Sequence, residues 1–141
     1  MFIAMPSKLE FSEGWYASEI THLCWYNQGK TQKKAIAELI DSLNEHLDSI
    51  GVEPKAYWKW TNKATLEGKV CIPLCQPTIA FILRQVRAYK AVSLMEAAKA
   101  AGQSSKNSIA AYEKIGGREP SLTKFAEFLK SYDVTSVEIC A

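Results

Sequence analysis

Six consecutive polar residues could form hydrogen bonds with the edges of nucleic-acid bases. They are Gln103, Ser104, Ser105, Lys106, Asn107 and Ser108. The sequence predicts a helix from Ser104 or Ser105 through Lys114, which places these residues at the N-terminal end of that helix. An asparagine such as Asn107 can pair with adenine, a lysine can bind guanine or a phosphate, and free amides at a helix N-terminus favour a phosphate. We therefore expect this end of the helix to contact base edges.

An excess of positive charge surrounds this segment. The whole chain has a formal net charge of only +2, but residues 81–118 contain seven basic side chains against two acidic ones, Glu96 and Glu113. The basic residues are Arg84, Arg87, Lys90, Lys99, Lys106, Lys114 and Arg118. Such a segment attracts a polyanion within a Debye length of roughly 10 Å, although a charged helix face is often only solvated. The residues expected to dock on phosphates are Arg84, Arg87, Lys90, Lys114 and Arg118.

Residue types that perform catalysis or bind metals are present, but their spacing does not group them. The candidates are the carboxylates Glu10, Glu13 and Glu19, the thiols Cys24, Cys71, Cys75 and Cys140, and the imidazoles His22 and His46. The carboxylates straddle a predicted turn, and the thiols contain no CxxC pair and are expected to be reduced. No nucleophile elbow, phosphate loop or HExxH motif is present. The sequence therefore indicates neither an enzyme nor a metal or cofactor site.

Helices are predicted throughout the second half of the chain. They span residues 78–89, 94–101, 104 or 105 to 114, and 122–132, and a short tail follows over 134–139. Ser93 and Ser121 are suitable N-caps for the second and last of these helices, and Gly102 interrupts the chain before the third. The second half is therefore expected to be all-α.

Two of these predicted helices resemble a Cro/repressor-type (XRE family) helix-turn-helix. The matching segments are Ser93 to Gly102, Asn107 to Glu113, and Arg118-Glu-Pro-Ser-Leu122, with one additional residue in the turn over 103–107 and another over 114–117. Ala97 would let the first helix approach the second, Gly102 permits the turn, and Ile109 would anchor the second helix on the core. The resemblance implies a lambda-repressor-like domain over 78–141 that binds double-stranded DNA. Ala111 and Tyr112 of the second helix would then join the DNA contacts. A helical bundle without a nucleic-acid partner is the alternative.

The first half of the chain combines strand and helix signals. Strands are predicted within residues 2–11 and 15–26, a helix over 31–50, an irregular linker over 52–68, and a short strand over 69–74. Thr31 is a suitable N-cap for the helix, and its apolar residues recur at spacings of three and four. In the irregular stretch, Trp58-Lys59-Trp60 could either stack on bases or cover the edge of a core.

This first half resembles the HicB family of toxin–antitoxin antitoxins. The resemblance depends on Gly14-Trp-Tyr-Ala-Ser18, on Gln28-Gly-Lys-Thr31 and on the helix from Lys34 to Leu43. It implies a partial ribonuclease-H-like sheet with one helix over 1–68, a connecting strand or linker over 69–77, and the helix-turn-helix domain over 78–141. The family's Asp-Leu-Pro-Gly-like turn near positions 21–24 is replaced here by Thr21-His-Leu-Cys24.

Taken together, the two resemblances imply an α+β antitoxin. Its N-terminal domain would cover a small HicA-type ribonuclease toxin, and its C-terminal domain would bind an operator and repress the operon as a homodimer or higher homo-oligomer. We expect a cytoplasmic protein without a membrane segment, because no apolar run approaches the roughly 20 residues that cross a bilayer and no signal peptide is evident. A stand-alone or phage-encoded transcriptional regulator is the main alternative, and a purely structural interaction protein is a third.

Overall fold

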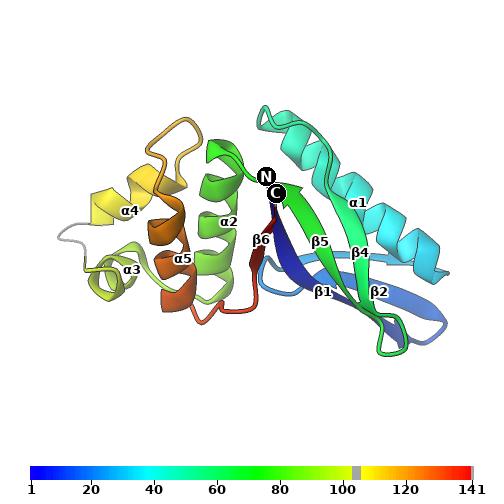
Figure 1. Cartoon of the computed structure of the whole chain (residues 1–141). Helices are drawn as coiled ribbons and strands as arrows, with labels where there is room; N and C mark the ends of the chain where they lie inside the picture. The colour runs from blue at the N-terminus through cyan, green and yellow to red at the C-terminus, as the bar shows by residue number, and fades with distance from the viewer. Residues whose placement is uncertain (103–105, 141) are drawn as a thin grey trace. The chain divides into compact units, whose positions relative to one another are not determined.

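The computed structural model divides into two compact units and describes residues 1–102 and 106–140 (Figure 1). Unit 1 comprises Met1–Leu74 together with the segment that starts at Ser136, and unit 2 comprises Cys75–Thr135. Unit 1 contains an antiparallel sheet with one helix, and unit 2 contains four helices. This arrangement confirms the predicted α+β class.

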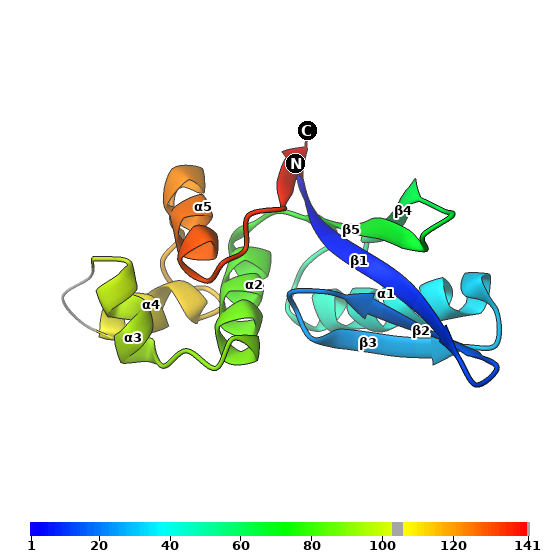
Figure 2. The same ribbon diagram turned by 90° about the horizontal axis from the view of Figure 1, so that it is seen from below.

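The sheet of unit 1 is built around its first strand. The strands are β1 (Phe2–Ser12), β2 (Trp15–Ile20), β3 (Trp25–Gly29), β4 (Tyr57–Asn62), β5 (Glu67–Pro73) and β6 (Glu138–Cys140). Five of them follow the order β3-β2-β1-β5-β4, and β6 pairs with β1 (Figure 2). All the pairings are antiparallel. The strands predicted within 2–11 and 15–26 are confirmed.

One edge of β1 serves two partners in succession. Residues Phe2–Ala4 pair with β6, whereas pairing with β2 begins at Ser7. Pro6 lies between these two stretches, and its carbonyl accepts a hydrogen bond from the Thr21 amide at 2.9 Å. Because the N–H and C=O of a strand residue point to the same side, the donor that proline lacks would also face Thr21, so the ladder between β1 and β2 ends at this residue.

One face of the sheet is covered by α1 (Gln32–Ser49). Its buried residues recur at a spacing of four and are Ala35, Leu39, Leu43 and Leu47. The side chain of Thr31 accepts from the Lys34 amide at 3.1 Å, so the predicted N-cap is confirmed. Polar contacts also join the helix to the sheet, since the Ser18 hydroxyl donates to the Ala35 carbonyl at 2.8 Å and the Trp25 indole donates to the Ser42 hydroxyl at 3.1 Å.

The stretch over 52–68, predicted as a linker, contains a strand instead. Its residues 57–62 form β4, which pairs with β5 at the edge of the sheet. Aromatic residues favour strands, and their alternation with lysines places Trp58 and Trp60 on the face that α1 covers while Lys59 points to the other face. The alternation of Trp58 and Trp60 with Lys59 is therefore the period-two pattern of a strand, which the sequence prediction of a linker missed.

The observed unit boundaries differ from the predicted domain limits of 1–68 and 78–141. Most of the segment 69–77 belongs to β5, which is bonded to β1 on one side and to β4 on the other. The tail predicted within the helical domain returns to unit 1, where Glu138–Cys140 pairs with Phe2–Ala4. A three-residue strand forms only because β1 offers an unpaired edge beyond the end of β2, and the local sequence does not indicate this.

The helices of unit 2 are α2 (Gln76–Tyr89), α3 (Leu94–Ala100), α4 (Lys106–Glu113) and α5 (Leu122–Ser131). Their core includes Ile82, Val86, Phe125, Phe128 and Leu129, each at most 2% exposed. The predicted caps Ser93 and Ser121 are confirmed, because each side chain accepts the backbone amide three residues ahead at 3.1 Å. Within the described residues, none of the helices has the length and apolar content needed to cross a membrane.

The close approach of β3 to α1 can be tested at Gly29. A Cβ atom at this position would lie 2.5 Å from the Ala35 nitrogen and 2.8 Å from the Lys34 carbonyl carbon. Since overpacking of this kind costs about 1–3 kcal/mol, Gly29→Ala should lower the free energy of unfolding of unit 1 by that amount. All four tryptophans belong to unit 1, so tryptophan fluorescence during urea unfolding measures this unit. The exposed neighbour provides a control, because Gln28→Ala should stay within about 0.5 kcal/mol. Equal effects of the two substitutions would contradict the close packing.

Candidate nucleic-acid interface

Helix α3 has three well-defined local features at its start, along its length and after its end. Ser93 and Glu96 form a reciprocal capping box at the start of α3, with the Glu96 carboxylate accepting from the Ser93 amide at 3.4 Å. Ala97 and Ala98 are each only 1% exposed, so their small side chains allow α3 to pack closely. Gly102 has a φ of +68°, a conformation that favours glycine, and it follows the end of α3. These positions agree with the roles expected of Ala97 and Gly102.

Helix α4 has distinct inner and outer faces. Ile109 and Tyr112 are 2% and 4% exposed and anchor the helix on the core. Lys106, Asn107 and Ala110 are exposed on the remaining surface. A spacing of three and four residues therefore separates a buried side from an accessible side, and the accessible side includes the first turn of the helix.

Two sets of polar contacts hold α4 against α2. The guanidinium of Arg87 donates to both carboxylate oxygens of Glu113, at 2.7 and 2.9 Å, and also to the Val92 carbonyl at 2.9 Å. The Gln76 amide donates to the Lys114 carbonyl at 3.0 Å and accepts from the Gly116 amide at 2.9 Å. These contacts act near the C-terminal end of α4 and fix its rotation about its own axis.

Arg87 is therefore not available for the phosphate contact predicted from the sequence. Its side chain is 18% exposed and its partner Glu113 is 7% exposed, so the two charges form a largely buried, bidentate ion pair. The hydrogen bond and charge of Glu113 raise the pKa of Arg87 above its ordinary value. Nearby, burial raises the pKa of Tyr132 to about 12, because the protein interior disfavours the phenolate.

Tyr112 is also misassigned as a DNA contact. Its ring packs against Phe128, with 5.4 Å between the ring centres, and it follows Ile109 on the buried side of α4. Two cations lie over the same ring, with the Arg118 guanidinium at 5.0 Å and the Lys124 ammonium at 5.5 Å from its centre. Tyr112 is thus almost inaccessible, and its ring supports two basic side chains.

The structure brings some of the predicted residues together and leaves others apart. Lys106, Asn107 and Lys114 are exposed at α4 or directly after it, and Ser108 and Ala111 are partly buried there. Arg118 joins them through Tyr112, together with Lys124, which the sequence analysis did not select. Lys124 could have been found from its place in the first turn of α5. Arg84 on α2 and Lys90 directly after this helix are exposed. The predicted positions Gln103, Ser104 and Ser105 lie outside the described residues.

Metal-binding residue types are dispersed over the described part of the chain. In the part of the chain that the structure describes, no three His, Cys, Asp or Glu residues come close enough to bind one. The four cysteines are free thiols. Unit 2 contains nine basic and five acidic residues, and the acidic Glu96, Glu119 and Glu127 are exposed among them.

The structural role of the Arg87–Glu113 pair can be tested by mutation. Arg87→Ala or Glu113→Ala would leave a buried charge without its partner, so each should destabilise unit 2 by about 3 kcal/mol or more. The double change Arg87→Met with Glu113→Leu should cost less than either single substitution, because no charge remains buried. Circular dichroism during urea unfolding follows the helices, and the tryptophan signal identifies the transition of unit 1.

Arg84→Ala is the matched control for this experiment, since Arg84 is an exposed arginine on the same helix. It should change the free energy of unfolding by less than about 0.5 kcal/mol. A double variant as unstable as the sum of the single variants would show that the two charges do not act as a pair.

None of the known protein-family models matches the sequence, and no curated protein is significantly similar to it.

Proposed function

We propose that unit 2 binds double-stranded DNA by inserting the first turn of α4 into the major groove. The observation that supports this proposal is the two-sided character of α4, whose inner side is fixed by Ile109, Tyr112 and the paired Glu113 while Lys106 and Asn107 are exposed. A major groove about 12 Å wide admits one α-helix, and lysine and asparagine are side chains that distinguish bases there.

The electrostatics of this surface favour a polyanion. Glu113 is the acidic residue of α4, and Arg87 neutralises it. The first turn of α4 contains no acidic residue, so the positive end of the helix dipole is not opposed locally. Lys114, Arg118 and Lys124 add exposed or partly exposed positive charge after the helix. We assign these three residues to the phosphate backbone and Lys106 and Asn107 to base edges.

A protein that occupies DNA in this way would act as a transcriptional regulator. An eight-residue helix contacts only a few base pairs, so we propose that two copies bind a pseudo-palindromic operator as a homodimer. Repression of its own operon is the regulatory outcome that the sequence resemblance implies.

For unit 1 we propose a protein partner, a small ribonuclease toxin of the HicA type. The proposal rests on the resemblance to HicB antitoxins and on the sheet face opposite α1, where Tyr26 and Tyr57 are 53% and 48% exposed. Exposed aromatic side chains of this kind are enriched in protein interfaces. A regulator without a toxin is the second candidate, because the DNA-binding surface belongs to unit 2 alone.

The roles of the α4 side chains can be tested with DNA from upstream of the gene. Lys106→Ala combined with Asn107→Ala should abolish the preference for this DNA over a scrambled duplex, a loss of about tenfold or more, while nonspecific binding survives. Lys114→Ala should weaken binding to both duplexes and reduce the slope of log affinity against log salt by about one, because one phosphate contact is lost. Fluorescence anisotropy at several salt concentrations measures both effects.

Lys55→Ala serves as the control, since it removes an exposed lysine of unit 1 that pairs with Glu53 at the surface. It should leave both affinities unchanged. If the Lys106/Asn107 double variant and the wild type have equal affinity for the upstream DNA, the assignment of α4 is wrong.

The toxin proposal can be tested by co-expression with a short neighbouring open reading frame. If that frame encodes a toxin, the wild-type chain should rescue growth, and Tyr26→Lys combined with Tyr57→Lys should rescue less well because charge would enter an apolar contact. The DNA affinity of this variant should equal that of the wild type. Absence of rescue by the wild type would favour the regulator without a toxin.

A further inference from the structure

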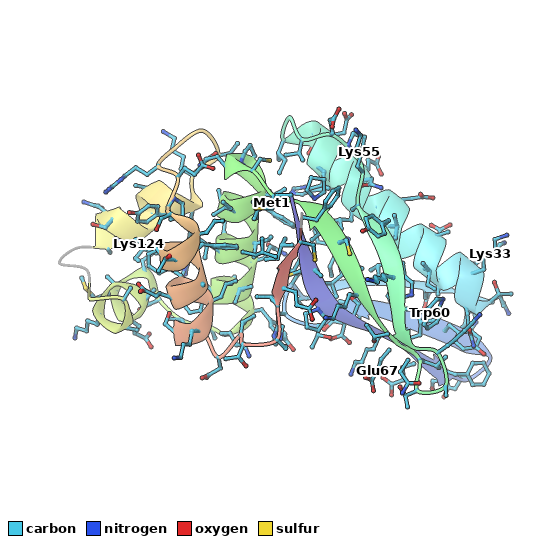
Figure 3. All side chains as sticks on the ribbon, viewed as in Figure 1. Met1, Lys33, Lys55, Trp60, Glu67 and Lys124 are labelled. Carbon is cyan, nitrogen blue, oxygen red and sulfur yellow. The ribbon has the colours of Figure 1, made fainter. Side chains whose placement is uncertain are left out.

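Unit 1 contains a pocket that neither DNA binding nor toxin binding uses. It has a volume of about 670 Å³ and lies between the first turns of α1 and the strands β2 and β4. Three lysines and three aromatic residues line it, namely Lys30, Lys33, Lys63, Tyr16, Trp58 and Trp60. Figure 3 shows Lys33 at the start of α1 and Trp60 on β4, at the same end of unit 1. Pockets for small molecules commonly measure about 300–1,000 Å³.

The path of α1 across the sheet explains this pocket. The helix begins beside β3, where Gly29 lies against Lys34, and its other end reaches the residue before β4, where the Asn44 side chain bonds both the N–H and the C=O of Ala56. Because α1 crosses the sheet from the end of β3 to the start of β4, it covers the start of β4 and leaves the end of that strand uncovered. The strand registers place Tyr16, Trp58 and Trp60 on the face toward α1, so these rings line the uncovered part.

The charged residues that line the pocket are all positive, and the ammonium of one of them, Lys30, lies 4.5 Å from the centre of the Trp15 ring. The lining includes Lys30, Lys33 and Lys63, and among the described lining residues none is acidic. The first turn of α1 also contains no acidic residue. Thr31 caps the Lys34 amide, but the amides of Gln32 and Lys33 have no acceptor within the helix. The pocket therefore offers both lysine ammonium groups and the N-terminal end of a long helix to an anion.

The aromatic residues supply flat apolar surface beside these charges. Trp58 and Trp60 meet edge to face, with 5.3 Å between their ring centres, and the Lys63 ammonium lies 5.7 Å from the Trp60 ring centre. Trp58 lies against Gly68, where a Cβ would be 2.4 Å from its ring. The Trp58 indole nitrogen is buried and has no hydrogen-bond partner within the described residues. Trp58 thus covers the core edge, as one sequence alternative held, and still contributes to the pocket wall.

We propose that this pocket binds a nucleotide, with the base against the Trp60 ring and the phosphates held by the three lysines and the first turn of α1. Stacking on an aromatic side chain accepts any base, because every base has a π face. Ammonium groups and helix-terminal amides bind phosphate. The nucleotide could be free or could be the phosphorylated end of a single strand, since both present the same chemistry.

Titration of the full chain with adenosine triphosphate tests the proposal. Calorimetry and tryptophan fluorescence should both report binding, and adenosine or inorganic triphosphate alone should bind at least tenfold more weakly, because each lacks one half of the contact. Lys30→Ala, Lys33→Ala and Lys63→Ala combined should weaken adenosine triphosphate binding at least tenfold, as should Trp60→Leu. A 5′-phosphorylated single-stranded oligonucleotide that binds more tightly than the mononucleotide would identify a strand end as the natural ligand.

The matched control is Lys59→Ala, because Lys59 lies between the two tryptophans in sequence but on the opposite face of the sheet. It should leave nucleotide affinity unchanged, and all the pocket variants should retain wild-type affinity for duplex DNA. Failure to bind adenosine triphosphate at millimolar concentration overturns the proposal, and so does equal binding by the triple-lysine variant and the wild type. Inorganic triphosphate that binds as tightly as adenosine triphosphate would overturn the role of the aromatic rings. None of these outcomes depends on α4.

Discussion

One largely buried ion pair, between Arg87 and Glu113, joins α4 to α2 and contributes both to the orientation of α4 and to its surface charge. A charge removed from water loses several kcal/mol of hydration, and only a partner with good geometry offsets this loss. The bidentate contact at 2.7 and 2.9 Å meets that requirement. It also fixes which side of α4 faces the core and removes the carboxylate that would otherwise oppose a phosphate backbone. The same ion pair therefore contributes to the stability of unit 2 and to the positive charge of the outer surface of α4.

The sequence predicted elements whose signals are local. The helix α1 was evident from its apolar spacing and its Thr31 cap, and Ser93 and Ser121 marked two helices of unit 2 in the same way. The sequence-based prediction failed where a residue's structural role depends on a partner that is distant in the sequence. Arg87 has the same appearance in sequence whether it faces solvent or Glu113, which is 26 residues away, and β6 exists only because β1 has a free edge. Tyr112 differs, because its spacing of three from Ile109 already indicated a buried position.

The lysines of the two units lie on surfaces of different shape. In unit 2 the lysines and arginines project from the outer side of helices, where a large and regular polyanion can reach several of them at once. In unit 1 three lysines border a concave surface with aromatic walls, so that only a small or terminal group could contact all of them. Under the two proposals the same residue type would bind two ligand shapes in one chain, and the surrounding apolar residues would decide between them.

The return of the chain to β1 makes unit 2 an insertion within unit 1. Phe2 pairs with Pro73 on one side and with Cys140 on the other. Since neighbouring strands lie about 4.8 Å apart, the chain leaves and re-enters the sheet about 10 Å apart. A short linker could bridge that gap without disturbing the pairing of β1. The sheet could therefore accept a different inserted unit in place of unit 2, provided that the two ends of that unit lie a similar distance apart.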